Sequence, residues 1–325
     1  HIITMSSVTR RIIREYTTDD CTTPCQRACP AGIDICEYIR HIHLGDYHRA
    51  VQVIKERNPF PTVIGRICPR PCEEECRRQY IDEPVAINYL KRYAADYEKS
   101  SGQRILPFKA PATGRKVAVV GGGVEGLSTA FFAARLGHDT TVFEAEEKLG
   151  GLLRKAIARE RLPMDILDWD IDGVLEMGVT AETGQMLGRD YTIDTLLNKG
   201  YEAIFLASGG WDSRLARSGA GKVEQPIPGT HQLIEVMQSR NRDTAEITIG
   251  THVMIVGGGS AALETALWSK EKGAQQVTVL FREDELTLNF SEDQRSAAVS
   301  QGIELRYEHG VTRLMGRGSQ LRSLE

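Results

Sequence analysis

Six cysteines near the start of the chain fall into two short runs with the spacing of metal ligands. Cys21 to Pro30 reads C-x3-C-x3-C-P, and Cys68 to Cys76 repeats C-x3-C-x3-C. Each iron of an iron–sulfur cluster needs a soft anionic ligand, and tight loops shield the cluster from water. The two runs therefore predict [4Fe-4S] ligation by Cys21, Cys25, Cys29, Cys68, Cys72 and Cys76.

Two questions about these thiols stay open on the residues alone. A structural zinc ion could take four of the thiolates, although zinc sites more often use two-residue spacing. Six cysteines also cannot fill two cubane clusters, so one cluster is expected and a second would need a non-cysteine or external ligand. Cys36 could contribute another ligand, but a buried helical thiol is the favoured interpretation.

A glycine-rich turn between two apolar strands predicts a dinucleotide site. Within Lys116–Glu144 a strand is followed by G-x-G-x-x-G, a helix and a second strand that ends on an acid. The glycines allow a tight turn, the approach of a pyrophosphate and close helix–strand packing. The pyrophosphate then lies at the helix N-terminus, and the acid suits a ribose diol. The residues expected to contact this dinucleotide are Gly121, Gly122, Gly123, Val124, Gly126 and Glu144.

The same arrangement returns at Thr251–Arg282, with alanine in place of the third glycine. We interpret Arg282, at the end of the second strand, as the counterpart of Glu144, because an arginine accommodates a 2′-phosphate. Glu283 follows directly and weakens this interpretation, and a solvated strand end is the alternative. The residues expected to hold NADP, with NAD possible, are Gly257, Gly258, Gly259, Ser260, Ala262 and Arg282.

Composition narrows the class of protein. A length of 325 residues predicts two or three domains. The net charge of −4 does not favour nucleic acid, and no apolar run is long enough for membrane insertion. All seven cysteines precede residue 77, which suits metal binding in a reducing, cytoplasmic compartment. No catalytic Ser/His/Asp or paired-carboxylate set stands out, and His41, His43 and His48 predict an exposed helical face rather than a metal site.

The elements that must position these residues divide the chain into three parts. The first part shows short helical patterns without strand alternation, and from Arg115 strands alternate with helices. Pro107–Gly114 and Ser218–Gly229 are typical of linkers. The expected elements include helices at Ile35–Ile42, Tyr47–Glu56 and Met164–Glu176 and a strand at Ala203–Ala207. The predicted fold class is α/β, with two Rossmann-like nucleotide-binding domains (109–228 for FAD, 229–325 for NAD(P)) preceded by an α-helical [4Fe-4S] domain (1–108).

Taken together, these residues resemble the family of the glutamate synthase small subunit. This family includes the N-terminal half of dihydropyrimidine dehydrogenase, the large subunit of the NADH-dependent ferredoxin:NADP oxidoreductase and modules of electron-bifurcating complexes. Besides the two glycine turns, the matching motifs are Cys25–Pro30 with Ile33, Asn58–Pro61, Gly65–Pro69, Cys72–Arg77, Pro84–Ile87, Gly150–Arg154, Arg161–Pro163 and Ala207–Gly209.

The resemblance implies FAD on the first nucleotide fold, NADP(H) on the second and two [4Fe-4S] clusters. It implies that Cys29, Cys68 and Cys72 share one cluster, and that Cys21, Cys25 and Cys76 share the other. It further implies that the flavin lies along Gly150, Gly151 and Leu152, with Gly209 in the motif that follows a later strand.

The chain departs from the family at several places. No cysteine precedes Cys21, and Lys91 stands where relatives place a Gln or Glu that can ligate iron. Ala156-Ile157-Ala158 replaces the family's Gly-Ile-Pro near the expected flavin ring. The Gly-Asp motif with which relatives complete the FAD domain is not reached before Glu325, so this domain is expected to be incomplete.

The predicted function is an oxidoreductase module that passes hydride and electrons between NADP(H), FAD and iron–sulfur clusters to a partner subunit. The expected partners are redox subunits that resemble the glutamate synthase large subunit or are linked to hydrogenase or ferredoxin. The alternative is a non-catalytic electron-wiring or scaffold subunit with partly vestigial nucleotide sites. The altered Ala156–Ala158 segment favours this alternative, whereas the intact glycines and Glu144 favour the enzyme.

Overall fold

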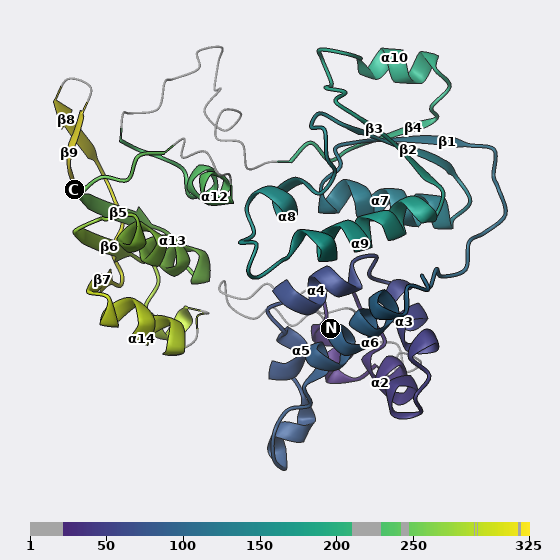
Figure 1. Cartoon of the computed structure of the whole chain (residues 1–325), viewed down its shortest axis with the longest axis horizontal. Helices are drawn as coiled ribbons and strands as arrows, with labels where there is room; N and C mark the ends of the chain where they lie inside the picture. The colour runs from purple at the N-terminus through teal and green to yellow at the C-terminus, as the bar shows by residue number, and fades with distance from the viewer. Residues whose placement is uncertain (1–21, 210–228, 242–246, 289, 291, 318–319) are drawn as a thin grey trace, which may run out of the picture.

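The computed structural model describes residues 22–209, 229–241, 247–288, 290, 292–317 and 320–325. Cys21 and nearly all of the predicted linker at Ser218–Gly229 lie outside these residues. The described chain forms a helical N-terminal region, a parallel sheet flanked by helices, and a second, smaller parallel sheet (Figure 1).

The N-terminal region consists of short helices, with no strand among its described residues. Asp34 and Asp46 begin two of them, and each carboxylate accepts a hydrogen bond of 3.0 Å from a backbone N–H in the first turn. Three others begin with proline, which needs no N–H partner there. The helices are α1 (Pro24–Ala28), α2 (Ile35–His43), α3 (Tyr47–Lys55), α4 (Pro61–Ile67), α5 (Pro71–Glu74), η1 (Arg77–Tyr80) and α6 (Ile87–Ser101). The predicted helices at Ile35–Ile42 and Tyr47–Glu56 are confirmed within one residue at each end.

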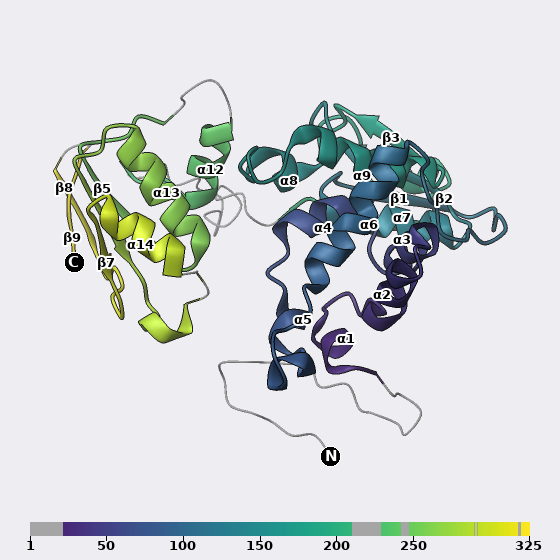
Figure 2. The same ribbon diagram turned by 60° about the horizontal axis from the view of Figure 1, so that its bottom comes forward.

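A buried ion pair holds this helical region together. Lys55 on α3 donates to Glu98 on α6 at 2.6 Å, and both side chains are almost fully buried. Lys55 also donates to the carbonyl of Ile105, and the N–H of Ile105 donates to Glu98. Lys55 on α3 therefore binds both α6 and the chain that leaves it, although the second carboxylate oxygen of Glu98 has no hydrogen-bond partner among the described residues. Figure 2 shows the two cysteine-bearing helices α1 and α5 side by side beneath α6.

The first sheet is parallel, with strand order β3-β2-β1-β4. Its two faces bury different clusters: Val119 and Val142 pack with α7 and α9, and Val120 and Phe143 pack with α10. Val120 pairs with both Phe143 and Leu206, so the C-terminal ends of β1, β2 and β4 meet at one edge, where doubly wound folds bind ligands. The elements are β1 (Lys116–Val120), α7 (Val124–Arg135), β2 (Asp139–Glu144), α8 (Gly151–Lys155), α9 (Met164–Glu176), β3 (Val179–Thr183), α10 (Ile193–Asn198) and β4 (Ala203–Leu206).

Helix α4 joins the helical region to the first sheet. Phe60 and Val63 belong to the same buried cluster as Leu127 and Phe131 of α7. Val63 donates its backbone N–H to the buried carboxylate of Asp170 on α9, at 2.9 Å. The helical region and the first sheet therefore share packed apolar residues, although the predicted domain boundary runs between them.

The second sheet is parallel, with strand order β5-β6-β7, and an antiparallel pair, β8 with β9, follows it. Phe281, directly after β6, is fully buried and stacks on Tyr307 with ring centroids 5.4 Å apart. The elements are α12 (Leu233–Asn241), β5 (His252–Val256), α13 (Ser260–Glu271), β6 (Gln276–Leu280), η2 (Glu285–Thr287), α14 (Glu292–Ser300), β7 (Ile303–Arg306), β8 (Leu314–Arg317) and β9 (Gln320–Leu324).

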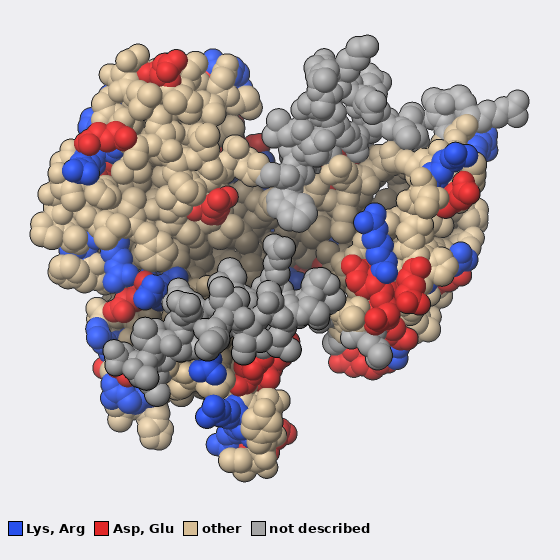
Figure 3. Space-filling model, turned by 180° about the vertical axis from the view of Figure 1, so that it is seen from behind, with Lys and Arg blue, Asp and Glu red and all other residues tan. Residues whose placement is uncertain are grey.

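The surface carries charges of both signs. On the face in Figure 3, Lys and Arg side chains alternate with Asp and Glu over the helical region, and acidic side chains gather on the lobe that contains β5–β7. Across the described ranges, none of the helices has the length and apolar character needed to cross a lipid bilayer.

Candidate functional site

The fold brings three of the predicted cysteine ligands together. Cys29 follows α1, Cys68 follows α4 and Cys72 lies in α5. Burial, together with negative charge on Cys68 and Cys29, raises the pKa of the Cys72 thiol to about 11. Cys29 also packs against the buried apolar cluster that contains Cys72. These are the cysteines that the family resemblance assigns to one cluster.

Backbone N–H groups point at two of the sulfur atoms. Arg70 N–H donates to Cys68 Sγ at 3.4 Å, and Val85 N–H donates to Cys76 Sγ at 3.5 Å. At the first run, the hydroxyl of Thr23 lies 3.1 Å from Cys25 Sγ. Hydrogen bonds to thiolate sulfur tune the reduction potential of an iron–sulfur cluster. The loops therefore offer both cysteine ligands and hydrogen-bond donors to their sulfur atoms, as an iron–sulfur cluster needs.

Two further residues near the cysteines differ in burial. Lys91 is 6% exposed, and no hydrogen bond or ion pair joins it to another described residue. Burial lowers the pKa of its ammonium group, and the thiolates of Cys68, Cys29 and Cys72 act in the opposite direction. Cys36 is exposed at the start of α2, so the expectation of a buried helical thiol is wrong. It lies at the first turn, where its side chain faces solvent and Thr23.

No group of three or more His, Cys, Asp or Glu side chains in the described ranges surrounds a point as a single metal ion requires. A cubane cluster makes a different demand, because each thiolate binds its own iron atom and the thiolates stand apart around the cluster. The described Cys25, Cys29, Cys68, Cys72 and Cys76 lie in or directly beside α1 and α5, two helices that contact each other.

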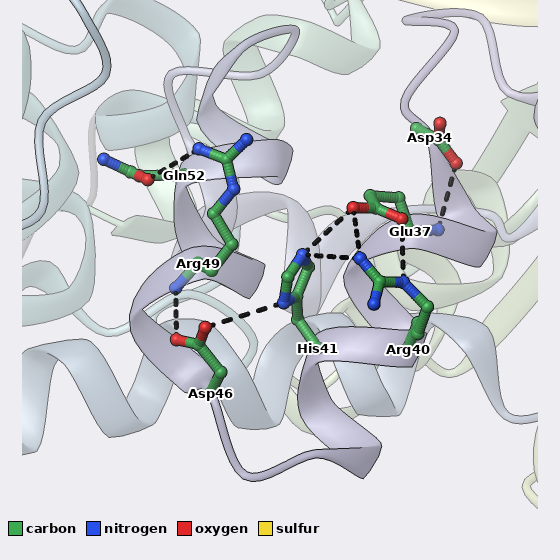
Figure 4. Close-up of polar contacts among 7 residues, drawn as sticks. All are labelled: Asp34, Glu37, Arg40, His41, Asp46, Arg49 and Gln52. Atoms are coloured by element: carbon green, nitrogen blue, oxygen red, sulfur yellow. Dashed lines mark hydrogen bonds and ion pairs between the residues drawn. The ribbon is translucent and has the colours of Figure 1, made fainter.

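One of the three clustered histidines, His41, is largely buried and lies between two carboxylates. The side chain of His41 is only 11% exposed, and it lies between the carboxylates of Glu37 at 3.0 Å and Asp46 at 3.6 Å (Figure 4). Asp46 also begins α3, so the imidazole ties the end of α2 to the start of α3. The prediction of a solvated face is therefore wrong for His41, whose role in this arrangement is structural.

At two positions of the first glycine turn, any side chain would clash with neighbouring backbone atoms. Gly121 has φ +110°, and a Cβ there would lie 2.1 Å from the carbonyl oxygen of Ala207. A Cβ on Gly126 would lie 1.9 Å from the carbonyl oxygen of Gly121. Helix α7 begins at Gly123 without a side-chain cap. Its first N–H groups are therefore available to an anion such as a pyrophosphate, as predicted.

Glu144 lies against this turn. Its carboxylate accepts from Gly122 N–H at 2.5 Å and from Glu146 N–H at 2.9 Å, and the residue is only 9% exposed. Gly150 N–H donates to the carbonyl of Gly122 at 2.8 Å, which brings the Gly150–Leu152 segment to the same edge. The remaining predicted residues also lie there: half-buried Gly151 and Leu152, exposed Val124, and Gly209 just beyond β4.

The second turn repeats this construction with more room. Ser260 is the first residue of helix α13, and Gly259 directly before it provides no side-chain cap. Gly257 and Gly259 have positive φ angles of 154° and 83°. Ala262 is fully buried, so this turn accepts the methyl group that Gly126 could not carry. Gly258 lies between them in the turn and completes the predicted set.

The strand register corrects the position of Arg282. Val120 pairs with Phe143 in the first fold, and Val256 pairs with Leu280 in the second. The residue that follows the pair is Glu144 in the first fold but the buried Phe281 in the second. Arg282 stands one position further along. The helix–turn segment of the second fold is one residue longer, which sequence spacing alone did not reveal.

The two nucleotide folds contact each other through a residue that sequence reasoning missed. Asn241, the last residue of α12, donates its side-chain amide to the carbonyls of Lys155 and Ile157 at 3.0 and 2.7 Å. Arg159 donates to the carbonyl of Asn241 at 3.0 Å. The altered Ala156–Ala158 segment is thus bound by the second fold. No local pattern marks Asn241, because its partners lie more than eighty residues away.

Comparison with known protein families assigns both parts of the chain. Residues 14–103 match the family described as dihydropyrimidine dehydrogenase domain II, 4Fe-4S cluster. Residues 115–325 match the pyridine nucleotide-disulphide oxidoreductase family. These matches indicate an iron–sulfur cluster, FAD and NAD(P) as the cofactors of the chain.

Two individual proteins that are similar to this chain are also subunits of NADP- or NAD-dependent dehydrogenases. The beta subunit of the NADP(+)-dependent formate dehydrogenase of Moorella thermoacetica is 32% identical over 94% of this chain and 46% of its own length. The NAD-dependent dihydropyrimidine dehydrogenase subunit PreT of Escherichia coli K12 is 30% identical over 87% of this chain and 67% of its own. The chain thus spans about half the length of the first relative.

Among solved structures, the 6-hydroxypseudooxynicotine amine oxidase of Pseudomonas geniculata N1 matches 87% of this chain and 40% of its own, with a TM-score of 0.50 and 17% identity. At that identity the match shows the fold alone. With two uncapped glycine turns, a cysteine-bearing helical region and these relatives, the chain belongs to the pyridine nucleotide-disulphide oxidoreductase family, with a dihydropyrimidine dehydrogenase domain II ahead of it.

Proposed function

We propose that this chain passes electrons between NAD(P)H and iron–sulfur centres through FAD, as one subunit of a larger redox complex. The observation that carries the proposal is the packing of α4 on α9. Helix α4 ends at Cys68, and α9 belongs to the fold that contains the first glycine turn. A cysteine loop and a flavin fold that share buried residues suit electron transfer between the two cofactors.

The residues have separate tasks in this proposal. When bound, FAD exchanges the two-electron hydride of a nicotinamide for the single electrons that a cluster carries, and the accompanying proton goes to solvent. Glu144 would accept from the FAD ribose, the segment Gly150–Leu152 with Gly209 would lie beside the flavin, and the two uncapped helices would hold the pyrophosphates. The cysteines would hold clusters in the two sets that the resemblance implies, with Cys21 as the third cysteine of the second set and a non-cysteine or external group as its fourth ligand.

Partner subunits are part of the proposal. The relatives in Moorella and Escherichia are both named as subunits of NADP- or NAD-dependent dehydrogenases. We propose that the substrate chemistry lies on a partner of this chain, which is a redox subunit of the glutamate synthase, hydrogenase-linked or ferredoxin-linked kind. Nothing in the proposal requires nucleic acid or a membrane.

The test is reduction of an artificial dye by the purified full-length protein under anaerobic conditions, with NADH and NADPH as donors. Glu144→Arg should abolish flavin retention and dye reduction, because the carboxylate that faces Gly122 is lost and a guanidinium group is too large for that space. Glu147→Arg makes the same charge change at an exposed position three residues away and should leave both intact. If neither NADH nor NADPH bleaches the flavin spectrum, the proposal fails, and the non-catalytic electron-wiring or scaffold subunit is the interpretation that stands.

A further inference from the structure

We infer that Glu283, rather than Arg282, faces the second dinucleotide and makes this site select NAD(H) over NADP(H). The inference rests on the proposed function, because it names the nucleotide that the second fold takes. The relatives do not decide the matter, since one is named as NADP-dependent and another as NAD-dependent.

The two glycine turns have the same neighbours at their middle glycine. A Cβ on Gly122 would lie 3.0 Å from Glu144 Oε2 and 2.5 Å from Leu149 Cδ2. A Cβ on Gly258 would lie 3.4 Å from Glu283 Oε2 and 3.5 Å from Leu288 Cδ2. In each fold a glutamate and the leucine five residues after it cover the turn. Glu283 is therefore the spatial counterpart of Glu144, although the strand register places it further along the chain.

Arg282 lies on the other side of this loop. Its Cγ and Nε atoms each lie 4.0 Å from the position of a Cβ on Gly310, in the segment that follows β7. The three atoms nearest to a Cβ on Gly258 belong to Glu283 and Leu288, and nothing lies within 4 Å of a Cβ on Gly257 or Gly259. Glu283 is exposed, and no hydrogen bond or ion pair occupies its carboxylate among the described residues.

The chemistry of a free carboxylate at this place is selective. Its oxygens accept hydrogen bonds from the two hydroxyl groups of an adenosine ribose, which NAD presents. NADP carries a phosphate on one of those hydroxyls, and two negative groups at contact distance repel each other. Asp284 follows Glu283 directly and places a second carboxylate in this loop, whereas Glu285 is ion-paired with Arg295.

Binding can be measured without turnover by titrating the oxidised full-length protein with NAD+ and with NADP+ in a calorimeter. Wild type should bind NAD+ about tenfold or more tightly than NADP+, which is the size expected of a hydrogen bond to a charged group. Glu283→Gln should weaken NAD+ binding about tenfold and bring the ratio of the two affinities close to one. Glu271→Gln, the same change at the far end of α13, should alter neither affinity.

The outcomes separate this inference from the function on which it rests. Tighter binding of NADP+ by wild type, weakened by Arg282→Gln, would overturn the role of Glu283 and leave the function standing. Preference for NAD+ that survives Glu283→Gln would also overturn the inference. Binding of neither nucleotide by wild type would overturn the nucleotide site itself, and with it both proposals.

Discussion

Residues between the predicted cysteine ligands shape the loops that carry them. Arg70 lies between two prolines in Cys68-Pro-Arg-Pro-Cys72 and has a left-handed φ of +65°, which costs a non-glycine residue about 1–2 kcal/mol. That conformation aims its N–H at Cys68 Sγ, and its guanidinium group lies 4.5 Å from the centre of the Tyr89 ring. A cation–π contact offsets part of the backbone cost. The strained backbone of Arg70 therefore provides a hydrogen bond to the sulfur of Cys68.

The cysteines themselves give a direct test at this scale. Cys72→Ser should lower the iron content of the purified protein by about one cubane cluster, because a serine hydroxyl is a poor ligand for iron. Cys36→Ser should leave it unchanged, since this thiol is exposed at the start of α2. Iron and acid-labile sulfide analysis measures both. Equal iron loss in the two variants would instead assign Cys36 to a cluster.

Asp170 predicts a pH effect on stability. The residue is 2% exposed, and burial raises the pKa of its carboxyl to about 7. Negative charge on Glu98 raises the pKa as well, whereas the Val63 N–H, Thr62 and Lys55 lower it. The folded protein therefore keeps a proton that the unfolded chain, with a pKa near 3.8, releases. The stability that this proton contributes is present below that value and is lost as the pH rises toward 7.

Substitution isolates this contribution. Asp170→Asn removes the titration, so the unfolding temperature of wild type relative to the variant should fall between about pH 4 and about pH 7. The change corresponds to a few kcal/mol at most. Asp139→Asn, at an exposed carboxylate, should show no such trend. A difference between wild type and Asp170→Asn that is constant with pH would mean that Asp170 is ionised throughout this range.

At the scale of elements, helix α4 connects the two cofactor regions. Its N-terminus receives the Asp170 carboxylate from α9, and its C-terminus is Cys68. A helix of seven residues is about 10 Å long and moves as a rigid unit. A displacement of α9 would therefore also displace Cys68. The position of Cys68 therefore depends on the flavin fold.

The third position of the glycine turn is Gly126 in the first fold and Ala262 in the second, so each residue can be replaced by the other. Gly126→Ala should destabilise the first fold and abolish flavin retention, because its methyl group would meet the carbonyl of Gly121 at 1.9 Å. Ala262→Gly removes a methyl that fits, and should cost only about 1 kcal/mol for a glycine within a helix. Thermal unfolding and flavin absorbance measure the contrast. Similar losses in both variants would contradict the difference in room between the turns.

For the whole molecule, the second nucleotide fold meets the first at the end of α12 and at a shared ion-pair cluster. Asn241 binds the chain after α8, and Glu264 of α13 lies 3.7 Å from Arg161 and 3.8 Å from Arg240. Both contacts involve the segment between α8 and α9, which the family resemblance places near the flavin ring. The relative position of the two nucleotides therefore depends on a few polar contacts.

Asn241→Ala should slow flavin reduction by saturating NADH about tenfold and leave the affinity for the nucleotide unchanged. The amide anchors the second fold but does not touch the glycine turn, so positioning is lost without binding. Stopped-flow absorbance measures the reduction rate. Asn198→Ala, at the exposed end of α10, is the matched control. A change in affinity with no change in rate would place Asn241 in nucleotide binding instead.

The sequence by itself determined the local features of this protein. The glycine turns, the first helices, α9 and the cysteine spacing were all readable, because each depends on residues a few positions apart. The family resemblance rested on the same short motifs. The exposure of Cys36, the partners of His41 and the place of Arg282 were not readable in this way.

Only the tertiary structure decided which distant residues meet. Asp170 reaches Val63 across more than a hundred positions, and Asn241 reaches Ile157 across more than eighty. The strand register aligns Phe281 with Glu144, and only the folded loop shows that the carboxylate of Glu283, two residues later, turns toward the glycines. Such contacts depend on how whole elements pack, and no local pattern encodes that packing.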